Sequence, residues 1–155
     1  MKRTLLALCI SLGLATTGLS ALGIGGAFSV GVLGGLPSSA MLSLKLDNVP
    51  PILGLGISVG GGSAQIGATA DWWLYHSTLA GPLSIYLGLG GYADIQTGTG
   101  GYFGLGARLP IGLQIFPLKP LELFLEIAPR AGITLNPFYF PSWGIQGAAG
   151  FRFWF

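Results

Sequence analysis

Few residues of this sequence could carry out catalysis. The single histidine, His76, stands next to Ser77, and such a pair can form the base and the nucleophile of a hydrolase such as a protease or a lipid deacylase. No acidic residue in the run from Tyr75 to Thr78 could orient the imidazole. The run also separates two apolar segments, which indicates a turn. We therefore interpret His76 as a polar turn residue.

Two carboxylates offer a second candidate site. Glu122 and Glu126 share one face of a predicted strand, and paired carboxylates supply the acid and the base or nucleophile of glycosidases. Four residues of extended strand separate two side chains by about 13 Å, whereas a retaining pair stands about 5 Å apart. Arginine partners explain these glutamates better. We expect no enzymatic activity, no cofactor and no metal site.

The charged residues share a more informative property, which is their position relative to the large aliphatic side chains. Nine of them fall on the face opposite the aliphatic residues: Lys45, Asp47, Asp71, Asp94, Arg108, Glu122, Glu126, Arg130 and Arg152. Only Lys119, in a predicted turn, stands outside this pattern. A charge that faces lipid near the bilayer centre costs roughly 2–4 kcal/mol. The sorting therefore predicts strands with one face toward lipid and the other toward a polar interior.

Eight alternating segments position these charges. Each alternates large apolar with small or polar residues, which is the period of a β-strand. The segments span about 22–33, 40–48, 52–60, 64–75, 83–93, 102–116, 121–134 and 143–155. The chain is 51% hydrophobic, but its 28 glycines and 10 prolines interrupt every apolar run beyond the N-terminus that could form a spanning helix. In a bilayer the other structure that satisfies the backbone is a closed barrel. The sequence predicts an all-β, antiparallel, up-and-down transmembrane barrel of eight strands.

The first twenty residues are typical of a secretory signal peptide. Lys2 and Arg3 provide the positive start, the segment 5–15 is apolar, and Gly18 and Ser20 are small residues suited to a cleavage site. We expect cleavage after residue 20, which leaves a single barrel domain over residues 21–155.

The mature chain would carry no cysteine, because the one cysteine, Cys9, lies in the signal segment. Its charges would balance. The sequence has seven Lys and Arg and five Asp and Glu, and removing Lys2 and Arg3 leaves five of each sign. This balance argues against nucleic acid as a partner.

The C-terminal strand is the most distinctive segment. Phe151, Phe153 and Phe155 lie on one face, and Arg152 and Trp154 lie on the other. With the signal segment and the eight amphipathic strands, this ending resembles the small outer-membrane barrels of the OmpA-transmembrane, OmpX and OmpW type. The segments 108–113 and 122–129 are similar to a little-characterised subgroup of such barrels.

The resemblance implies a monomer in the outer membrane of a Gram-negative-type bacterium, reached by Sec-dependent export. It also implies outer-membrane lipid, periplasmic chaperones and the barrel-assembly machinery as partners. For the family, Phe151, Phe153 and Phe155 would carry the assembly signal.

The lumen is expected to hold an ion-pair network. Its predicted members are Lys45, Asp47, Asp71, Arg108, Glu122, Glu126, Arg130 and Arg152. We expect Glu126 to lie opposite Arg152, with Arg108 nearby, since buried charges must be paired. Two interpretations stay open: the network is a structural plug, or its pairs exchange partners and open a narrow passive path for a solute.

The alternative function lies outside the lumen. With both termini in the periplasm, the segment 136–142 forms an outer loop that carries Phe138, Tyr139 and Phe140. These aromatic residues could anchor the barrel at the membrane interface. They could also contact a partner, which would make the chain a surface adhesion or interaction protein.

Overall fold

The computed structural model describes residues 21–34, 37–47, 49–98 and 100–155, so the predicted signal peptide lies outside the described residues. Nine strands form this part of the chain. They are β1 (Leu22–Leu33), β2 (Ser39–Leu46), β3 (Pro51–Gly60), β4 (Ser63–Ala80), β5 (Leu83–Gly98), β6 (Tyr102–Arg108), β7 (Ile111–Leu118), β8 (Leu121–Leu135) and β9 (Tyr139–Trp154). Among the described residues there is no helix long and apolar enough to span a membrane.

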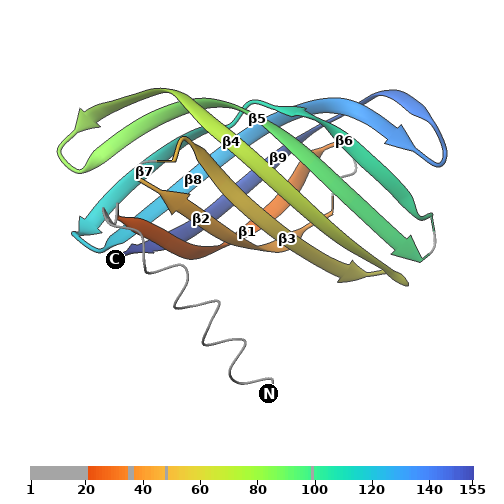
Figure 1. Cartoon of the computed structure of the whole chain (residues 1–155), viewed down its shortest axis with the longest axis horizontal. Coiled ribbons are helices and arrows are strands. Elements are labelled where there is room, and N and C mark those ends of the chain that lie inside the picture. Colours follow the sequence, from red (N-terminus) through yellow and green to blue (C-terminus); the bar gives the residue numbers. More distant parts are fainter. Residues whose placement is uncertain (1–20, 35–36, 48, 99) are drawn as a thin grey trace, which may run out of the picture.

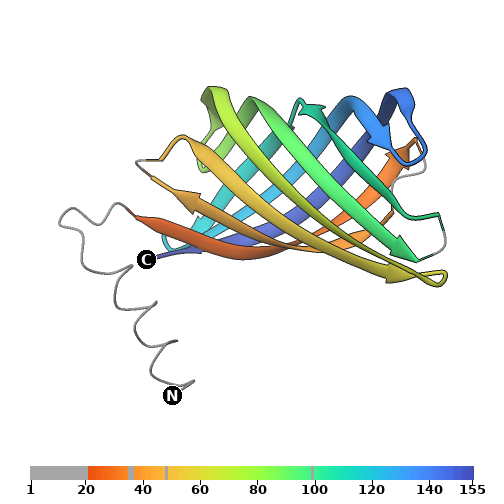
Figure 2. The ribbon, with the colours of Figure 1, turned by 45° about the vertical axis from the view of Figure 1, so that its right-hand side comes forward.

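The strands close into an antiparallel barrel (Figures 1 and 2). Its wall has eight strand positions, one of which is occupied by two short strands in succession. β1 pairs with both β2 and β9, which joins the first strand to the last. β6 and β7 share one position, because each lies between β5 and β8. Together they are the predicted sixth strand, interrupted at Pro110, which has no N–H to donate. The Pro110 carbonyl still accepts a hydrogen bond from the Gly88 N–H at 2.7 Å, so the wall stays continuous.

The wall is apolar outside and polar inside. Along every strand, large aliphatic side chains at alternate residues are exposed: Leu55, for example, is 52% exposed and Leu125 is 60% exposed. Charged side chains at the intervening positions are nearly inaccessible, with Glu122 at 0% and Arg108 at 5%. This is the reverse of a soluble protein and the expected arrangement for a barrel surrounded by lipid. The core of the molecule is therefore its lumen.

The fourth and fifth strands are longer than the alternation predicts. β4 continues to Ala80 instead of ending near residue 75, and β5 continues to Gly98 instead of ending near residue 93. A bulge in β4 is the cause of the first error: Trp73 pairs with Gly88, but Tyr75 pairs with Leu87. The extra residue reverses the faces beyond that point. Tyr75 is 56% exposed on the outside, and His76 lies opposite lumen-facing Tyr86 within the strand, not in a turn.

Glycines in the lumen make room for bulky neighbours. Seven lumen side chains stand directly across from a glycine on the next strand: Asp71↔Gly90, Trp73↔Gly88, Tyr86↔Gly112, Tyr92↔Gly106, Asp94↔Gly104, Phe124↔Gly150 and Trp154↔Gly23. A Cβ at Gly112 would overlap the Tyr86 ring, and one at Gly104 would overlap the Asp94 carboxylate. The glycine-rich lumen is therefore filled by the residues opposite, as eight-stranded barrels of this width require.

Candidate functional site

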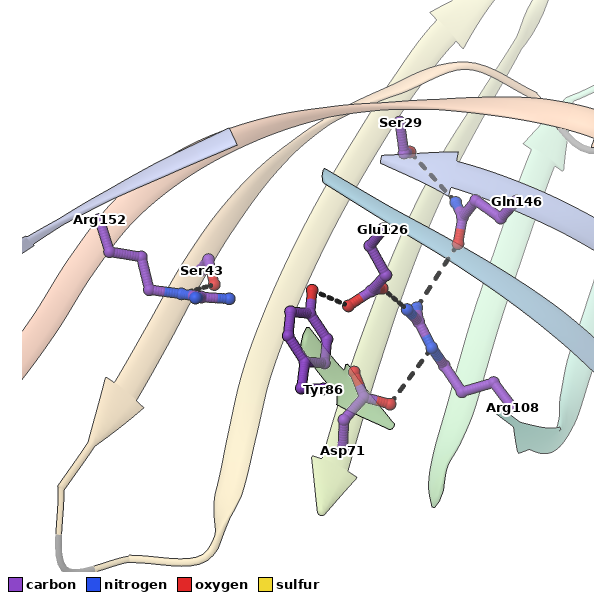
Figure 3. A network of polar contacts seen from close by, with 8 residues as sticks. All are labelled: Ser29, Ser43, Asp71, Tyr86, Arg108, Glu126, Gln146 and Arg152. Carbon is purple, nitrogen blue, oxygen red and sulfur yellow. Dashed lines mark hydrogen bonds and ion pairs between the residues drawn. The ribbon is translucent and has the colours of Figure 1, made fainter. Parts of the chain in front are cut away.

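Arg108 is the centre of the polar interior (Figure 3). Its side chain extends from the end of β6 and is 5% exposed. The guanidinium donates to Glu126 of β8 and, at 3.5 Å, to the Gln146 side-chain oxygen of β9. Its Nε lies 3.2 Å from Asp71 Oδ1 of β4, an ion pair without hydrogen-bond geometry. One cation thus connects four wall positions across the lumen.

The central cluster extends in two directions from Arg108. On one side, the Tyr86 hydroxyl of β5 donates to Glu126 Oε2 at 2.9 Å. On the other, the Gln146 amide donates to Ser29 Oγ of β1 at 3.1 Å, and Ser29 shares a 2.6 Å hydrogen bond with Ser39. Polar contacts therefore run from wall to wall through the barrel.

A second cluster lies toward the end of the barrel that carries β1's start and the C-terminus. Arg152 pairs with Glu122, which is 0% exposed, and donates to Ser43 Oγ at 2.8 Å. The Trp154 indole N–H donates to the other Glu122 oxygen at 2.8 Å. The Arg152 guanidinium also lies 4.1 Å from the centre of the Phe124 ring. Every charge in this cluster has a partner, as buried charges require.

A third cluster fills the opposite half of the lumen. Arg130 donates to Asp94 Oδ2 at 2.6 Å and lies over the Tyr92 ring at 3.8 Å. The Gln65 amide donates to the same Asp94 oxygen at 3.2 Å and to the Tyr102 hydroxyl at 2.8 Å. Asp94 is only 3% exposed.

The structure groups the predicted charges differently from the sequence analysis. The expected facing of Glu126 and Arg152 is wrong: Glu126 lies opposite Ala148, and Arg152 lies opposite Glu122. The position of the turn accounts for this: the β8–β9 turn spans residues 136–138 instead of the predicted 136–142, so each residue of β9 pairs four positions earlier in β8 than expected. Glu126 instead pairs with Arg108.

Two predicted members make no ion pair among the described residues. Asp47 is exposed in the turn after β2, beyond the lumen. Lys45 does face the lumen, but its ammonium lies 3.3 Å from the centre of the Trp73 ring and 5.3 Å from that of Trp154. An aromatic face thus takes the place of a carboxylate.

Several residues of the site are not among the predicted members of the network. Asp94 lies beyond the predicted segment 83–93, but it continues the alternation of β5 and shares the face of the other charges, which is the signal that could have included it. Tyr86, Gln146 and Ser29 carry no charge, and only the cross-lumen geometry shows that they complete the central cluster.

Little open space remains between the clusters. The hollows in the two halves of the described lumen measure about 40 and 30 Å³. A water molecule needs roughly 10–15 Å³ of such space, so each hollow holds at most a few waters. Within the described residues no group of three or more His, Cys, Asp or Glu side chains could hold a metal ion.

His76 has partners of its own at the rim of the lumen. Its Nε2 lies 2.8 Å from the Gln114 amide, and its ring stacks on Trp73 with centroids 5.2 Å apart. No carboxylate contacts the imidazole in the part of the chain that the structure describes. The geometry shows no catalytic arrangement around Ser77.

The two aromatic segments singled out in the sequence both face outward. Phe138, Tyr139 and Phe140 are 72%, 58% and 67% exposed at the β8–β9 connection. Phe151 and Phe153 are each 42% exposed on the outer surface of β9, and Phe155 is 81% exposed at the terminus.

No protein-family model and no curated protein sequence matches the chain. Four chains of solved structures are similar to it, among them the following two. Neisserial surface protein A (NspA) has a TM-score of 0.48 and 14% sequence identity, with 86% of this chain and 94% of that chain covered. OmpT, an outer membrane protein of Vibrio cholerae, has a TM-score of 0.32 and 14% identity, with 90% of this chain and 38% of that chain covered.

The molecule's own geometry decides its class. Its wall closes on itself, since the first strand pairs with the last, its outer surface is apolar, and the charged side chains of its strands face the lumen. This chain folds as a small transmembrane β-barrel.

Proposed function

We propose that the protein is a closed outer-membrane barrel whose interior is a structural polar core, not an open solute path. The observation that carries this proposal is the position of Arg108, held between Asp71, Glu126 and Gln146 across the lumen. A gate would need groups that lose these partners, and each unpaired buried charge costs several kcal/mol. A closed barrel of this kind would act through its surface and its two ends.

Solute flux into liposomes tests this proposal. The refolded wild-type barrel is expected to admit small sugars and ions no faster than protein-free liposomes. Replacing Glu126 with Gln keeps the shape but weakens the hold on Arg108, and we expect flux to stay at the background. A clear rise in flux in the folded Glu126→Gln variant would instead support a gate made of exchanging ion pairs.

The second candidate function is surface interaction through the aromatic β8–β9 tip, defined here as residues 137–141. The exposure of Phe138, Tyr139 and Phe140 favours it, because three adjacent aromatic side chains in one exposed connection are a typical contact surface. The connection at 61–62, by contrast, consists of glycines.

Replacing Phe138, Tyr139 and Phe140 together with serine tests the aromatic tip. If the tip binds a partner, the triple variant is expected to lose cell-surface attachment while keeping its heat-modifiable gel mobility. Replacing outward-facing Leu55 with alanine is the matched control, since it removes apolar surface from the wall alone. Attachment that survives the triple substitution would leave the tip as a membrane-interface anchor.

Biogenesis through the barrel-assembly machinery and periplasmic chaperones is a further part of the proposal. The outward-facing series Phe151, Phe153 and Phe155 supports it, because all three rings are accessible on one face of the last strand. Deleting Phe155 is expected to reduce the amount of barrel in the outer membrane several-fold while leaving refolding into detergent intact. An unchanged amount in the membrane would remove Phe155 from the assembly signal. We expect the barrel to be a monomer.

A further inference from the structure

Two small hollows lie one after the other along the lumen. The mouth hollow, of about 40 Å³, reaches Pro37 in the β1–β2 connection, at the end of the barrel away from the termini. The central hollow, of about 30 Å³, is lined by Asp71 and Arg108 of the central cluster. Of the described residues that line them, only Met41 and Thr69 belong to both hollows. These two side chains form the partition between the mouth hollow and the Arg108 cluster.

The partition lies over two glycines of β3. Met41 stands directly across from Gly56, and a Cβ added to this glycine would lie 3.3 Å from the Met41 Cγ. A Cβ added to Gly54 would lie 3.2 Å from the Met41 Cε and 2.5 Å from the Thr69 Oγ1. The two side chains therefore meet over the β3 backbone, where glycine leaves room for them. Most of the partition is the flexible thioether chain of Met41, a side-chain type that fills irregular gaps.

Met41 differs chemically from the groups around it. Its position in β2 continues the inward alternation of Ser43 and Lys45, so an apolar side chain stands in a polar lumen. It is the sole methionine of the sequence after the signal segment, since the other is Met1. Thioethers and thiols are the side-chain groups that peroxides oxidise, and the sequence beyond residue 20 contains no cysteine. Met41 is also partly exposed, so small solutes in the hollows can reach it.

We propose that Met41 is a site of oxidation by hydrogen peroxide, and that its oxidation opens the partition to water. Peroxide has two oxygen atoms and fits the mouth hollow, which has room for a few waters. The Met41 sulfur attacks one peroxide oxygen, the O–O bond breaks, and the sulfoxide forms together with one molecule of water. Sulfur loses two electrons and the peroxide gains them, so no further reactant is needed.

The sulfoxide changes the partition from apolar to polar. Its oxygen accepts hydrogen bonds, and the Thr69 hydroxyl, which makes no hydrogen bond within the described ranges, can donate to it. A polar partition also holds water where the thioether excluded it, because a buried water needs polar partners. The waters of the two hollows then become continuous, and Arg108 is hydrated from the mouth. The opening rests on the proposed function, since it needs a lumen that is closed while Met41 is reduced.

Mass spectrometry of the folded mature barrel in lipid nanodiscs tests the oxidation step. The probe is hydrogen peroxide at neutral pH, with N-acetylmethionine amide in the same solution as the reference. We expect Met41 to gain one oxygen atom no more than about tenfold more slowly than the reference, because the mouth hollow admits the oxidant. A slower reaction than this would overturn the assignment of Met41 as an oxidation site.

Proton exchange between water and the Arg108 Nε–H, measured by NMR on the same sample, tests the opening. This N–H makes no hydrogen bond among the described residues, so its exchange rate reports the access of water. We expect the exchange to become at least about tenfold faster after oxidation of Met41. Arg130 is the internal control, because it lines the mouth hollow in both states and its exchange should not change.

The variant Met41→Leu separates oxidation of this residue from every other effect of peroxide. Leucine conserves the apolar volume and has no sulfur, so slow exchange at Arg108 should persist after peroxide treatment. Heat-modifiable mobility verifies folding, and Met41→Ile serves in the same way if the leucine variant does not fold.

Three results of the exchange experiment would overturn the opening, and one of them reaches further. The first is slow exchange at Arg108 in the oxidised wild type, and the second is a leucine variant that responds to peroxide like the wild type. Both would leave the closed lumen of the proposed function intact. The third is fast exchange at Arg108 in the untreated wild type, which would contradict the closed lumen as well.

Discussion

Replacing Arg108 with methionine is expected to destabilise the barrel by about 3–5 kcal/mol, the usual cost of removing one partner from a buried ion pair. Methionine replaces the aliphatic part of the arginine side chain, so the loss comes mainly from the charge and hydrogen bonds of the guanidinium group. Asp71 and Glu126 would be left close together without a cation, at 9% and 11% side-chain exposure. Urea titration of the refolded protein, followed by tryptophan fluorescence, measures the free energy of unfolding.

Two further variants control for the Arg108 experiment. Lys119→Met removes a positive charge from an exposed turn and should leave the unfolding midpoint unchanged. Adding Asp71→Asn and Glu126→Gln to Arg108→Met should recover part of the lost stability, since neutral side chains no longer need the cation. An Arg108→Met variant as stable as the wild type would contradict the assignment of Arg108 as the centre of the core.

Replacing Gly112 with valine is expected to have the second large effect. The new side chain would occupy the position of the Tyr86 ring, which lies against Gly112 across the β5–β7 pair. Overfilling a core costs about 1–3 kcal/mol, and the lost hydrogen bond from Tyr86 to the Glu126 carboxylate costs about 1.5–3 kcal/mol more. The same urea titration should show the loss, together with reduced heat-modifiable mobility.

A double-variant cycle separates the clash from any general effect of valine. In a Tyr86→Ala background the ring is absent, so Gly112→Val should cost much less than in the wild type. Gly91→Ala is the matched glycine control, because this residue faces outward and its nearest contact for an added Cβ is 3.7 Å away. Equal costs for Gly112→Val in both backgrounds would contradict the pairing of large with small residues in the lumen.

Most of the fold follows from the period-two alternation. The opposition of Leu53, Leu55 and Ile57 to glycine and serine needs no tertiary information, and the predicted strand three corresponds to β3. The enclosure of the charges follows from the cost of placing Arg108 or Glu122 in lipid. These two constraints predict a closed barrel with eight wall positions, as the structure shows.

The partners within the site could not be predicted in the same way. A bulge moves every later residue of the strand to the opposite face of the wall. The residue types around Trp73 and Tyr75 do not indicate that a bulge lies there. The pairing of Arg108 with Glu126 depends on how β6 and β7 align with β8, and the turns between the strands set that alignment. The packing of the lumen also needs the structure, because composition alone does not show that Gly112 and Gly150 accommodate Tyr86 and Phe124.

The closed lumen is the central claim, and single-channel recording of the refolded mature barrel in planar bilayers tests it most directly. Folding would first be verified by heat-modifiable gel mobility. A silent bilayer with inserted wild-type barrel, combined with conductance steps after Arg108→Ala, is the result predicted by a lumen filled by the Arg108 cluster. Steady, discrete conductance from the wild-type barrel would contradict it.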